Sequence, residues 1–334
     1  MTLGVALPSF DRVPLADLDA ALAGLPAAAG VAQLLGPEDR NLLIGRPANL
    51  RRWTASHLGR GKPPAKGRRP PTDLSPVAAA VAWAATTSPF QQRLAYERLM
   101  ARHVPLSARR DLPAPAFLHL DPAERFPRIS VRRVEQGADG LFGPFRDRRR
   151  AEQARDRLHR EFPLRPCDYV FEPDPALPLG LGCLFAQVRS CSAPCLGRVA
   201  EADYRALAAR VAGRLARPGD RGDAGLASFV AAAGGRGIVV ATTASHVELY
   251  PVRAGRVLDG AAVVAPRGEW EAAAARLRWE DDQEEDPAGT TADWPWLSAW
   301  LHSPAGRNSW VALEEPADDA ALRAALEPLL GFFK

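Results

Sequence analysis

Apolar and polar positions alternate in short blocks along the first hundred residues. GVAQLL and LLIG are apolar runs on either side of a polar turn, GPEDRN, and this arrangement predicts a β-hairpin. Residues 12–25 space their apolar positions as one helix face does, so they predict a short amphipathic helix. The apolar run at residues 76–86 is compatible with either a strand or a helix.

Two further helices are expected in the same part of the chain. NLRRWTASHL predicts a helix with Asn49 as its N-cap, because a short polar side chain can accept a hydrogen bond from a free N–H of the first turn. PFQQRLAYERLMARH predicts a longer helix whose buried face carries Leu94 and Leu99. Residues 59–73, between them, are rich in glycine, proline and basic residues and predict a loop.

A second unit is expected from about residue 116. FLHL and RISVRRV predict two strands, LFGPF follows them, and a charged helix is expected from Asp147 to Glu161. Residues 163–198 are rich in proline and predict little regular structure. EADYRALAARVAGRLA predicts a helix that closes the unit.

A third unit has a different order of elements. RGIVVATT, VELYPVRAG and GRVLDGAAVV predict three strands, and EWEAAAARLRW predicts a helix before the acidic loop EDDQEEDPAGTTAD. WPWLSAWL predicts a helix, SWVALE a strand and residues 318–330 a last helix. Trp294, Trp296, Trp300 and Trp310 are expected to pack a small core, and a base-stacking surface is the alternative. The pattern predicts an α/β protein with domains at 1–112, 113–220 and 221–334.

The net charge of +4 hides an uneven distribution of charge. Residues 41–70 hold eight basic residues and no acidic one, whereas residues 269–334 hold fourteen acids and five bases. This asymmetry suggests a polyanion-binding surface on the first part of the chain. Forty arginines against three lysines support the other interpretation, a general bias toward arginine. No run of about 18 apolar residues and no signal peptide is apparent, so a cytoplasmic protein without membrane contact is expected.

All four cysteines lie within one short segment, with the spacing C-x15-C-x7-C-x3-C. Clustered cysteines in a chain without a secretion signal indicate a metal site before they indicate disulfides. Four thiolates can hold one zinc ion or an iron–sulfur cluster, and the wide spacing suits the larger group. The candidate metal ligands are Cys167, Cys183, Cys191 and Cys195.

Several motifs around these cysteines resemble the UvrC/Cho family of DNA-repair excinucleases. FPRISV, LFGPF, FPLRPC, CLFAQVRSCSAPCLG and EADYRAL follow one another with the order and spacing of that family, from about Arg125 to Leu207. The resemblance implies that the four cysteines ligate a [4Fe–4S] cluster, with zinc as the alternative. It also implies a cysteine-rich cluster region at 113–220 and a small C-terminal α+β domain at 221–334.

In that family a GIY-YIG nuclease domain precedes the cysteine region, and residues 1–112 resemble it in outline. Gly30-Val31-Ala32 and Leu43-Ile44-Gly45 stand at its two signature motifs, followed by Arg46 and by Asn49-Leu50. Glu97 stands where the family has its Mg²⁺-binding carboxylate, which makes it the one candidate catalytic residue. A solvated helix carboxylate is the other interpretation of Glu97.

Most of the other nuclease positions depart from the family. The mechanism needs a hydroxyl network, a cation and a polar metal-site residue. The positions in question hold Ala32, Leu43, Trp53 (with Arg52 one residue away), His57, and Leu106 or Ala108. Nuclease activity is therefore expected to be lost or strongly altered.

The resemblance implies a protein of nucleotide excision repair that binds DNA and other repair proteins. The helical hairpin that docks UvrB is not visible after Tyr204, so this docking is in doubt. The alternatives are an active single-incision endonuclease, with a rearranged site and Mg²⁺, and a non-enzymatic module that binds protein partners. The candidate DNA-binding residues are Arg46, Arg51, Arg52, His57, Arg148 and Arg149.

Overall fold

The computed structural model describes most of the chain, and all statements below concern that part. The described residues are 3–4, 8–63, 70–105, 108–109, 112, 115–121, 123–133, 140–177, 183–216, 231–232, 236–253, 255–277, 279, 293–306, 309–313 and 319–330. Part of the predicted basic loop, Leu106, the link between the second and third units and most of the acidic loop lie outside these residues. No helix in the described ranges combines the length and the apolar character needed to cross a membrane.

The first unit is a four-stranded antiparallel sheet in the order β2-β5-β3-β4. The hairpin prediction is confirmed by β3 and β4, and the ambiguous run at 76–86 forms a strand, β5. The prediction of one helix over 12–25 is wrong in its first half, because residues there form β2 and pair with β5 before Asp17 caps α1. The elements are β2 (Asp11–Pro14), α1 (Leu18–Gly24), β3 (Gly30–Leu35), a 3-10 turn η1 (Pro37–Asp39), β4 (Asn41–Gly45), α2 (Leu50–His57), β5 (Ala80–Ala85) and α3 (Pro89–His103).

The second unit is a smaller antiparallel sheet in the order β7-β6-β8-β9. The buried side of α4 packs on it through Ala151, Ala154 and Leu158, which share a core cluster with Leu118 of the sheet. The prediction of little regular structure around the cysteines is confirmed for residues 163–177 and 183–198, where only a short α-helix and a 3-10 turn form. The elements are β6 (Ala116–Leu120), β7 (Ile129–Arg132), β8 (Leu141–Phe145), α4 (Arg148–Glu161), α5 (Leu184–Gln187), η4 (Pro194–Leu196), α6 (Glu201–Ala216) and β9 (Ala231–Ala232).

The third sheet has the order β1-β13-β11-β10-β14, with β12 paired to β11. The prediction of one strand over GRVLDGAAVV is wrong, because a 3-10 turn divides it into β12 and β13. The predicted helix after it is shorter than expected. The elements are β1 (Leu3–Gly4), β10 (Arg236–Thr242), β11 (His246–Arg253), β12 (Arg256–Val257), η5 (Asp259–Ala261), β13 (Val263–Pro266), η6 (Arg267–Glu269), α7 (Trp270–Ala274), α8 (Trp294–Leu301), β14 (Trp310–Leu313) and α9 (Asp319–Leu330).

Alternate residues of β10 face two different cores, as the pleat of a strand requires. Ile238 and Val240 pack with α7 and α9, whereas Val239 and Ala241 pack with α8 and with α3. The prediction that the four tryptophans pack a core is confirmed: Trp294 and Trp296 are buried in the second of these clusters, and Trp300 and Trp310 pack against it.

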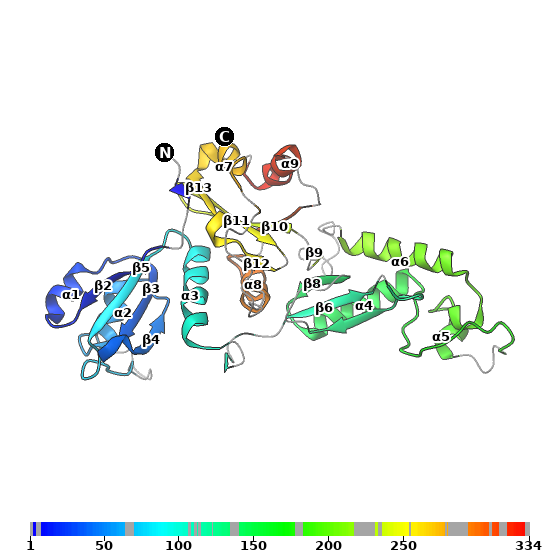
Figure 1. Ribbon diagram of the computed structural model, residues 1–334, viewed down its shortest axis with the longest axis horizontal. Coiled ribbons are helices and arrows are strands. Elements are labelled where there is room, and N and C mark those ends of the chain that lie inside the picture. Colours follow the sequence, from blue (N-terminus) through cyan, green and yellow to red (C-terminus); the bar gives the residue numbers. More distant parts are fainter. Residues whose placement is uncertain are drawn as a thin grey trace.

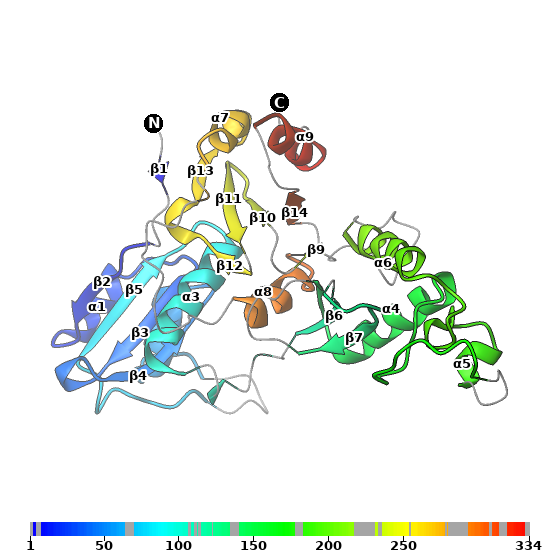
Figure 2. The same cartoon turned by 45° about the vertical axis from the view of Figure 1, so that its right-hand side comes forward.

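Helix α3 stands between the first sheet and the third unit (Figures 1 and 2). Its residues Phe90 and Leu94 share a core cluster with Phe117 and Leu141 of the second sheet and with Tyr250 of the third. Two short strands also pair with a unit other than the one they belong to in the sequence. Strand β1, at the start of the chain, joins the third sheet, and β9, which follows the second unit, joins the second sheet. The three units therefore meet in one common apolar core around α3 and α8.

Candidate functional site

Three of the positions that the resemblance assigns to the nuclease site, Ala32, Leu43 and Trp53, hold apolar side chains that pack within the first unit. Ala32 on β3 lies opposite Gly45 on β4 and Trp83 on β5. Leu43 and Trp53 pack against the apolar cluster of this unit. The Trp53 ring covers Gly45 so closely that a Cβ there would lie 2.5 Å from the ring. Neither a hydroxyl nor a cation therefore occupies these positions.

The candidate DNA-binding residues of the first unit have different environments. Arg52 is exposed at the first turn of α2, where its backbone N–H donates to Asn49 Oδ1 at 2.9 Å, which confirms the predicted cap. Arg46 is exposed, and its guanidinium lies 5.6 Å from the Tyr96 ring centroid. Arg51 donates to the carbonyls of Ala23 and Leu25 and so holds the end of α1. Its guanidinium is thus engaged within the protein.

His57 contacts different residues from those that these arginines contact. Its ring packs on Trp53 with the centroids 4.7 Å apart, and its Nδ1 lies 3.4 Å from the carbonyl oxygen of Thr72. The structure therefore places His57 against Trp53 and Arg46 against Tyr96, rather than bringing the two into one shared contact.

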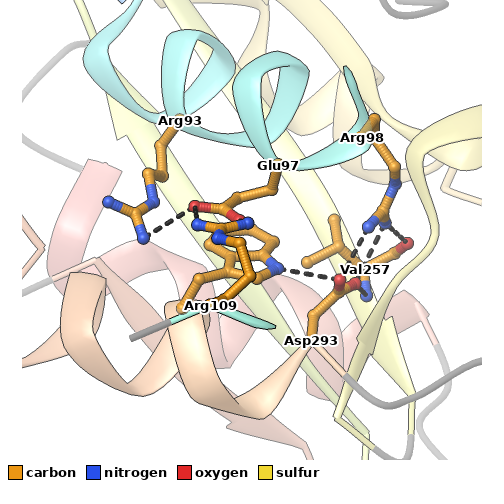
Figure 3. Close-up of polar contacts among 7 residues, drawn as sticks. Arg93, Glu97, Arg98, Arg109, Val257 and Asp293 are labelled. Carbon is orange, nitrogen blue, oxygen red and sulfur yellow. Dashed lines mark hydrogen bonds and ion pairs between the residues drawn. The ribbon is translucent and has the colours of Figure 1, made fainter. Parts of the chain in front are cut away.

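Glu97 is 4% exposed, which contradicts the interpretation of a solvated helix carboxylate. Its Oε1 lies 2.7 Å from a guanidinium nitrogen of Arg93, one helical turn earlier. Arg109, in the segment that follows α3, donates to Oε2 at 2.8 Å and to Oε1 at 3.4 Å. Figure 3 shows both guanidinium groups directed at this carboxylate. Both of its oxygens are therefore already engaged by cations of the chain.

The neighbouring residue Arg98 turns toward the third unit (Figure 3). It donates to both oxygens of Asp293, at 2.6 and 3.0 Å, and to the carbonyl of Val257 at 3.0 Å. Asp293 also accepts hydrogen bonds from the Val257 N–H and from the indole N–H of Trp296. This cluster fixes the start of α8 to the middle of α3.

A second buried carboxylate joins the same two units at the start of α3. Glu248 on β11 is fully buried and accepts hydrogen bonds from the hydroxyls of Thr87 and Ser88 and, at 2.8 Å, from Tyr250. Burial, followed by the Glu248 charge, raises the pKa of Tyr250 far above its ordinary value. Sequence reasoning missed Glu248; its only signal was a carboxylate in the middle of an otherwise apolar strand, VELYPVR.

The four cysteines are free thiols in one segment, and none forms a disulfide. Cys191 is buried, and its sulfur accepts a hydrogen bond from the Ala193 N–H at 3.3 Å. Burial first, together with the charges of Cys167, Cys183 and Cys195, raises the pKa of Cys191 to about 11 against the lowering effect of the Ala193 hydrogen bond. The four thiols thus lie within electrostatic range of one another. Within the described ranges, no group of three or more His, Cys, Asp or Glu residues is arranged to hold a metal ion.

Two residues outside the cysteine motif hold this segment on the second unit. The buried Arg165 guanidinium donates to the carbonyls of Phe126, Cys167 and Tyr169, at 2.7, 3.2 and 2.8 Å. Its backbone N–H donates to the Tyr204 hydroxyl at 2.8 Å, and that hydroxyl donates to the Pro127 carbonyl at 3.0 Å. Cys167 is therefore positioned by bonds that need no metal.

The arginines at the start of α4 form a separate exposed group. Asp147 caps the helix by accepting the Arg150 N–H at 2.9 Å, and Arg148 pairs with Glu152 at 2.7 Å. Arg149 is exposed beside them. Three arginines in the first turn oppose the helix dipole, which favours negative charge at this end. An external anion would relieve that arrangement.

Comparison with known proteins covers mainly the second unit. A family model described as the UvrC/Cho excinuclease middle domain matches residues 116–213. No solved structure matches the chain.

Curated relatives extend this match over a little more than half of the chain. UvrABC system protein C of Geobacter metallireducens is 30% identical over 192 residues, which are 55% of this chain and 29% of the relative. The protein of the same name from Methylobacillus flagellatus is 24% identical over 197 residues, 59% of this chain and 31% of the relative. The protein of the same name from Bifidobacterium longum is 37% identical over 108 residues, which are 30% of this chain and 14% of the relative. The chain spans less than a third of the length of these relatives.

Proposed function

Since residues 116–213 match the middle domain of the UvrC/Cho excinucleases, we propose that the chain belongs to this family and is a DNA-repair protein of the nucleotide excision repair type. It binds DNA and a [4Fe–4S] cluster, and it does not cut DNA by the GIY-YIG mechanism. The relatives are named as parts of a UvrABC system, so other repair proteins are proposed as partners.

The proposal that cleavage is lost rests on the ion pairs of Glu97. A catalytic Mg²⁺ takes carboxylate oxygens as ligands and acts as a Lewis acid on phosphate. Here the guanidiniums of Arg93 and Arg109 engage both Glu97 oxygens and would repel a divalent cation. Three of the other nuclease positions hold Ala32, Leu43 and Trp53, which supply no proton acceptor and no charge. A working site would need several of these changes reversed at once.

The exposed arginines support DNA binding without catalysis. Phosphate contacts need only guanidinium groups and do not depend on sequence. Arg46, Arg52, Arg148 and Arg149 are exposed and supply such groups. Arg51 would have to give up its bonds to α1 before it could reach a phosphate. The rearranged-site alternative, with His57, Arg46 and Arg52, is not favoured, because His57 packs on Trp53.

The donor set of the cysteine segment fits an iron–sulfur cluster. All four thiols are free, and the N–H of Ala193 already points at Cys191, the contact that stabilises a thiolate ligand. The four sulfurs of a [4Fe–4S] cluster bind separate irons, so they need not gather as closely as four ligands around one zinc ion. Arg165 and Tyr204 would hold Cys167 in place, and the bound cluster would tie the four cysteines into one covalent unit.

Binding and cleavage are tested together with the full-length protein. Fluorescence anisotropy with bubble and nicked duplex DNA is measured over a salt series, in Mg²⁺ or in EDTA, and the DNA is then analysed on gels. We expect affinity that falls steeply with salt, does not require Mg²⁺, and is accompanied by no incision. A flat salt response would count against phosphate binding. Mg²⁺-dependent incision that is lost in folded Glu97→Gln protein would overturn the proposal that the nuclease is inactive.

A further inference from the structure

An open pocket of about 450 Å³ lies where the first and third units meet. Its walls come from the start of α3, the end of β10, the turn after α8 and the last turn of α9, which lies at the top of the molecule in Figure 1. Phe90 and Trp300 supply aromatic rings, Thr242 and Ser309 supply hydroxyls, and Leu329 closes an apolar side. Among the described residues that line it, none is charged.

The aromatic wall of this pocket is built before any ligand binds. The Phe90 and Trp300 rings meet edge to face with their centroids 5.3 Å apart, and Phe90 also lies 4.7 Å from the Tyr250 ring. Ser88 anchors the start of α3 to Glu248, so Phe90 is fixed from the backbone side as well. Ser309 donates to the Gly306 carbonyl at 2.7 Å, which holds the turn that carries Ala305. A preformed pocket of this kind loses little conformational freedom on binding.

The lining selects a class of ligand. The described part of the wall gives no charged partner to a phosphate or a carboxylate, so it favours a neutral group. The half-buried Trp300 ring, backed by the buried Phe90 ring, offers stacking and edge contacts to a planar ring, and the exposed Thr242 hydroxyl can pair with ring nitrogens or exocyclic groups. A pocket of this volume accommodates a group of the size of a nucleobase with its sugar.

The pocket lies beside arginines that could hold a DNA backbone. His302 follows α8 between Trp300 and Pro304, which both line the pocket. Helix α8 also packs against β8, which ends at Phe145, directly before Arg146 and the exposed arginines at the start of α4. Charged groups for phosphate thus lie at one side of an uncharged pocket for a ring.

We propose that this pocket receives an unpaired, extrahelical nucleobase of DNA whose phosphates lie on the α4 arginines. The inference rests on the proposed DNA binding and adds the part of the substrate that the third unit would contact. Extruding a base costs least where it is mismatched, damaged or bulged, so such a pocket would favour DNA with a defect over intact duplex.

Full-length protein is tested with three DNA duplexes of one sequence: fully paired, with one bulged 2-aminopurine, and with a bulged abasic site. We expect about tenfold tighter binding of the 2-aminopurine duplex than of the other two, because stacking one base is worth roughly a five- to 150-fold change in affinity. We also expect a change in 2-aminopurine fluorescence on binding. Ala305→Trp fills the mouth of the pocket from an exposed turn and should remove the preference without changing the affinity for paired DNA.

The matched control is Ala202→Trp, an exposed position on α6 that does not line the pocket and should keep the preference. Equal affinity for the three duplexes, or a preference that survives Ala305→Trp, would overturn this pocket while DNA binding itself stands. Failure to bind any of the three would overturn the proposed DNA binding, and the pocket with it.

Discussion

Adjacent residues of α3 serve different parts of the molecule. Glu97 pairs with Arg93 and Arg109, whereas Arg98 pairs with Asp293 of the third unit. Consecutive helix positions do not face the same neighbours, so each side chain finds its own partners. The sequence pointed to Glu97 but not to its environment, because Arg109 lies twelve residues further on, outside any local pattern.

Replacing Glu97 by glutamine should destabilise the protein strongly. Two guanidinium groups would lose their common counter-ion in a buried site, and such a loss costs roughly 2–4 kcal/mol. Urea unfolding followed by tryptophan fluorescence measures the change in the free energy of unfolding. Glu152→Gln is the control, because it breaks an exposed pair with Arg148 and should cost less than about 0.5 kcal/mol. A cost at Glu97 as small as that at Glu152 would mean that Glu97 is not a structural ion pair.

Most helices and strands follow from local patterns, and the exceptions have physical reasons. The β3–β4 hairpin and the Asn49 cap of α2 are encoded by neighbouring residues, so the sequence predicted both. Residues 11–14 become β2 only because β5 lies beside them, almost seventy residues later in the chain. The packing of Trp53 over Gly45 likewise depends on how α2 lies across the sheet. Contacts between residues that are distant in the sequence could not be predicted from the local pattern.

The cysteine segment is the element whose order should depend most on its ligand. We expect anaerobically purified protein to contain about four irons and four sulfides per chain, with a broad visible absorption band. Cys191→Ser should lower the iron content and destabilise the segment, because it removes a buried ligand. Ser192→Ala changes the next residue without touching a sulfur and should keep the iron. One zinc without sulfide would indicate the alternative metal, and a protein that takes up no metal would contradict the proposed site.

At the scale of the whole molecule, the second and third units both pack against α3 of the first unit. The Arg98–Asp293 pair and the Glu248 cluster each join residues more than 150 positions apart, and the aromatic core lies between them. Domain boundaries predicted from composition could not reveal this junction. Taken alone, Arg98, Glu248 and Asp293 are ordinary polar residues of the local sequence, and nothing near them in the sequence indicates their partners. The junction also forms the proposed base pocket, so its rigidity bears on function.

The Arg98–Asp293 pair should therefore hold the third unit on the first. Asp293→Ala leaves the Arg98 guanidinium, the Val257 N–H and the Trp296 indole N–H without their carboxylate, a loss of about 3 kcal/mol. A double-mutant cycle with Arg98→Ala should give a coupling free energy of about 2 kcal/mol, measured by urea unfolding. The exposed pair Arg12–Asp39 is the control and should give about 0.5 kcal/mol. Because the pair also orients α8, Asp293→Ala should weaken the preference for bulged DNA more than the affinity for paired duplex. A coupling no larger than that of the surface pair would mean that the apolar core alone holds the two units together.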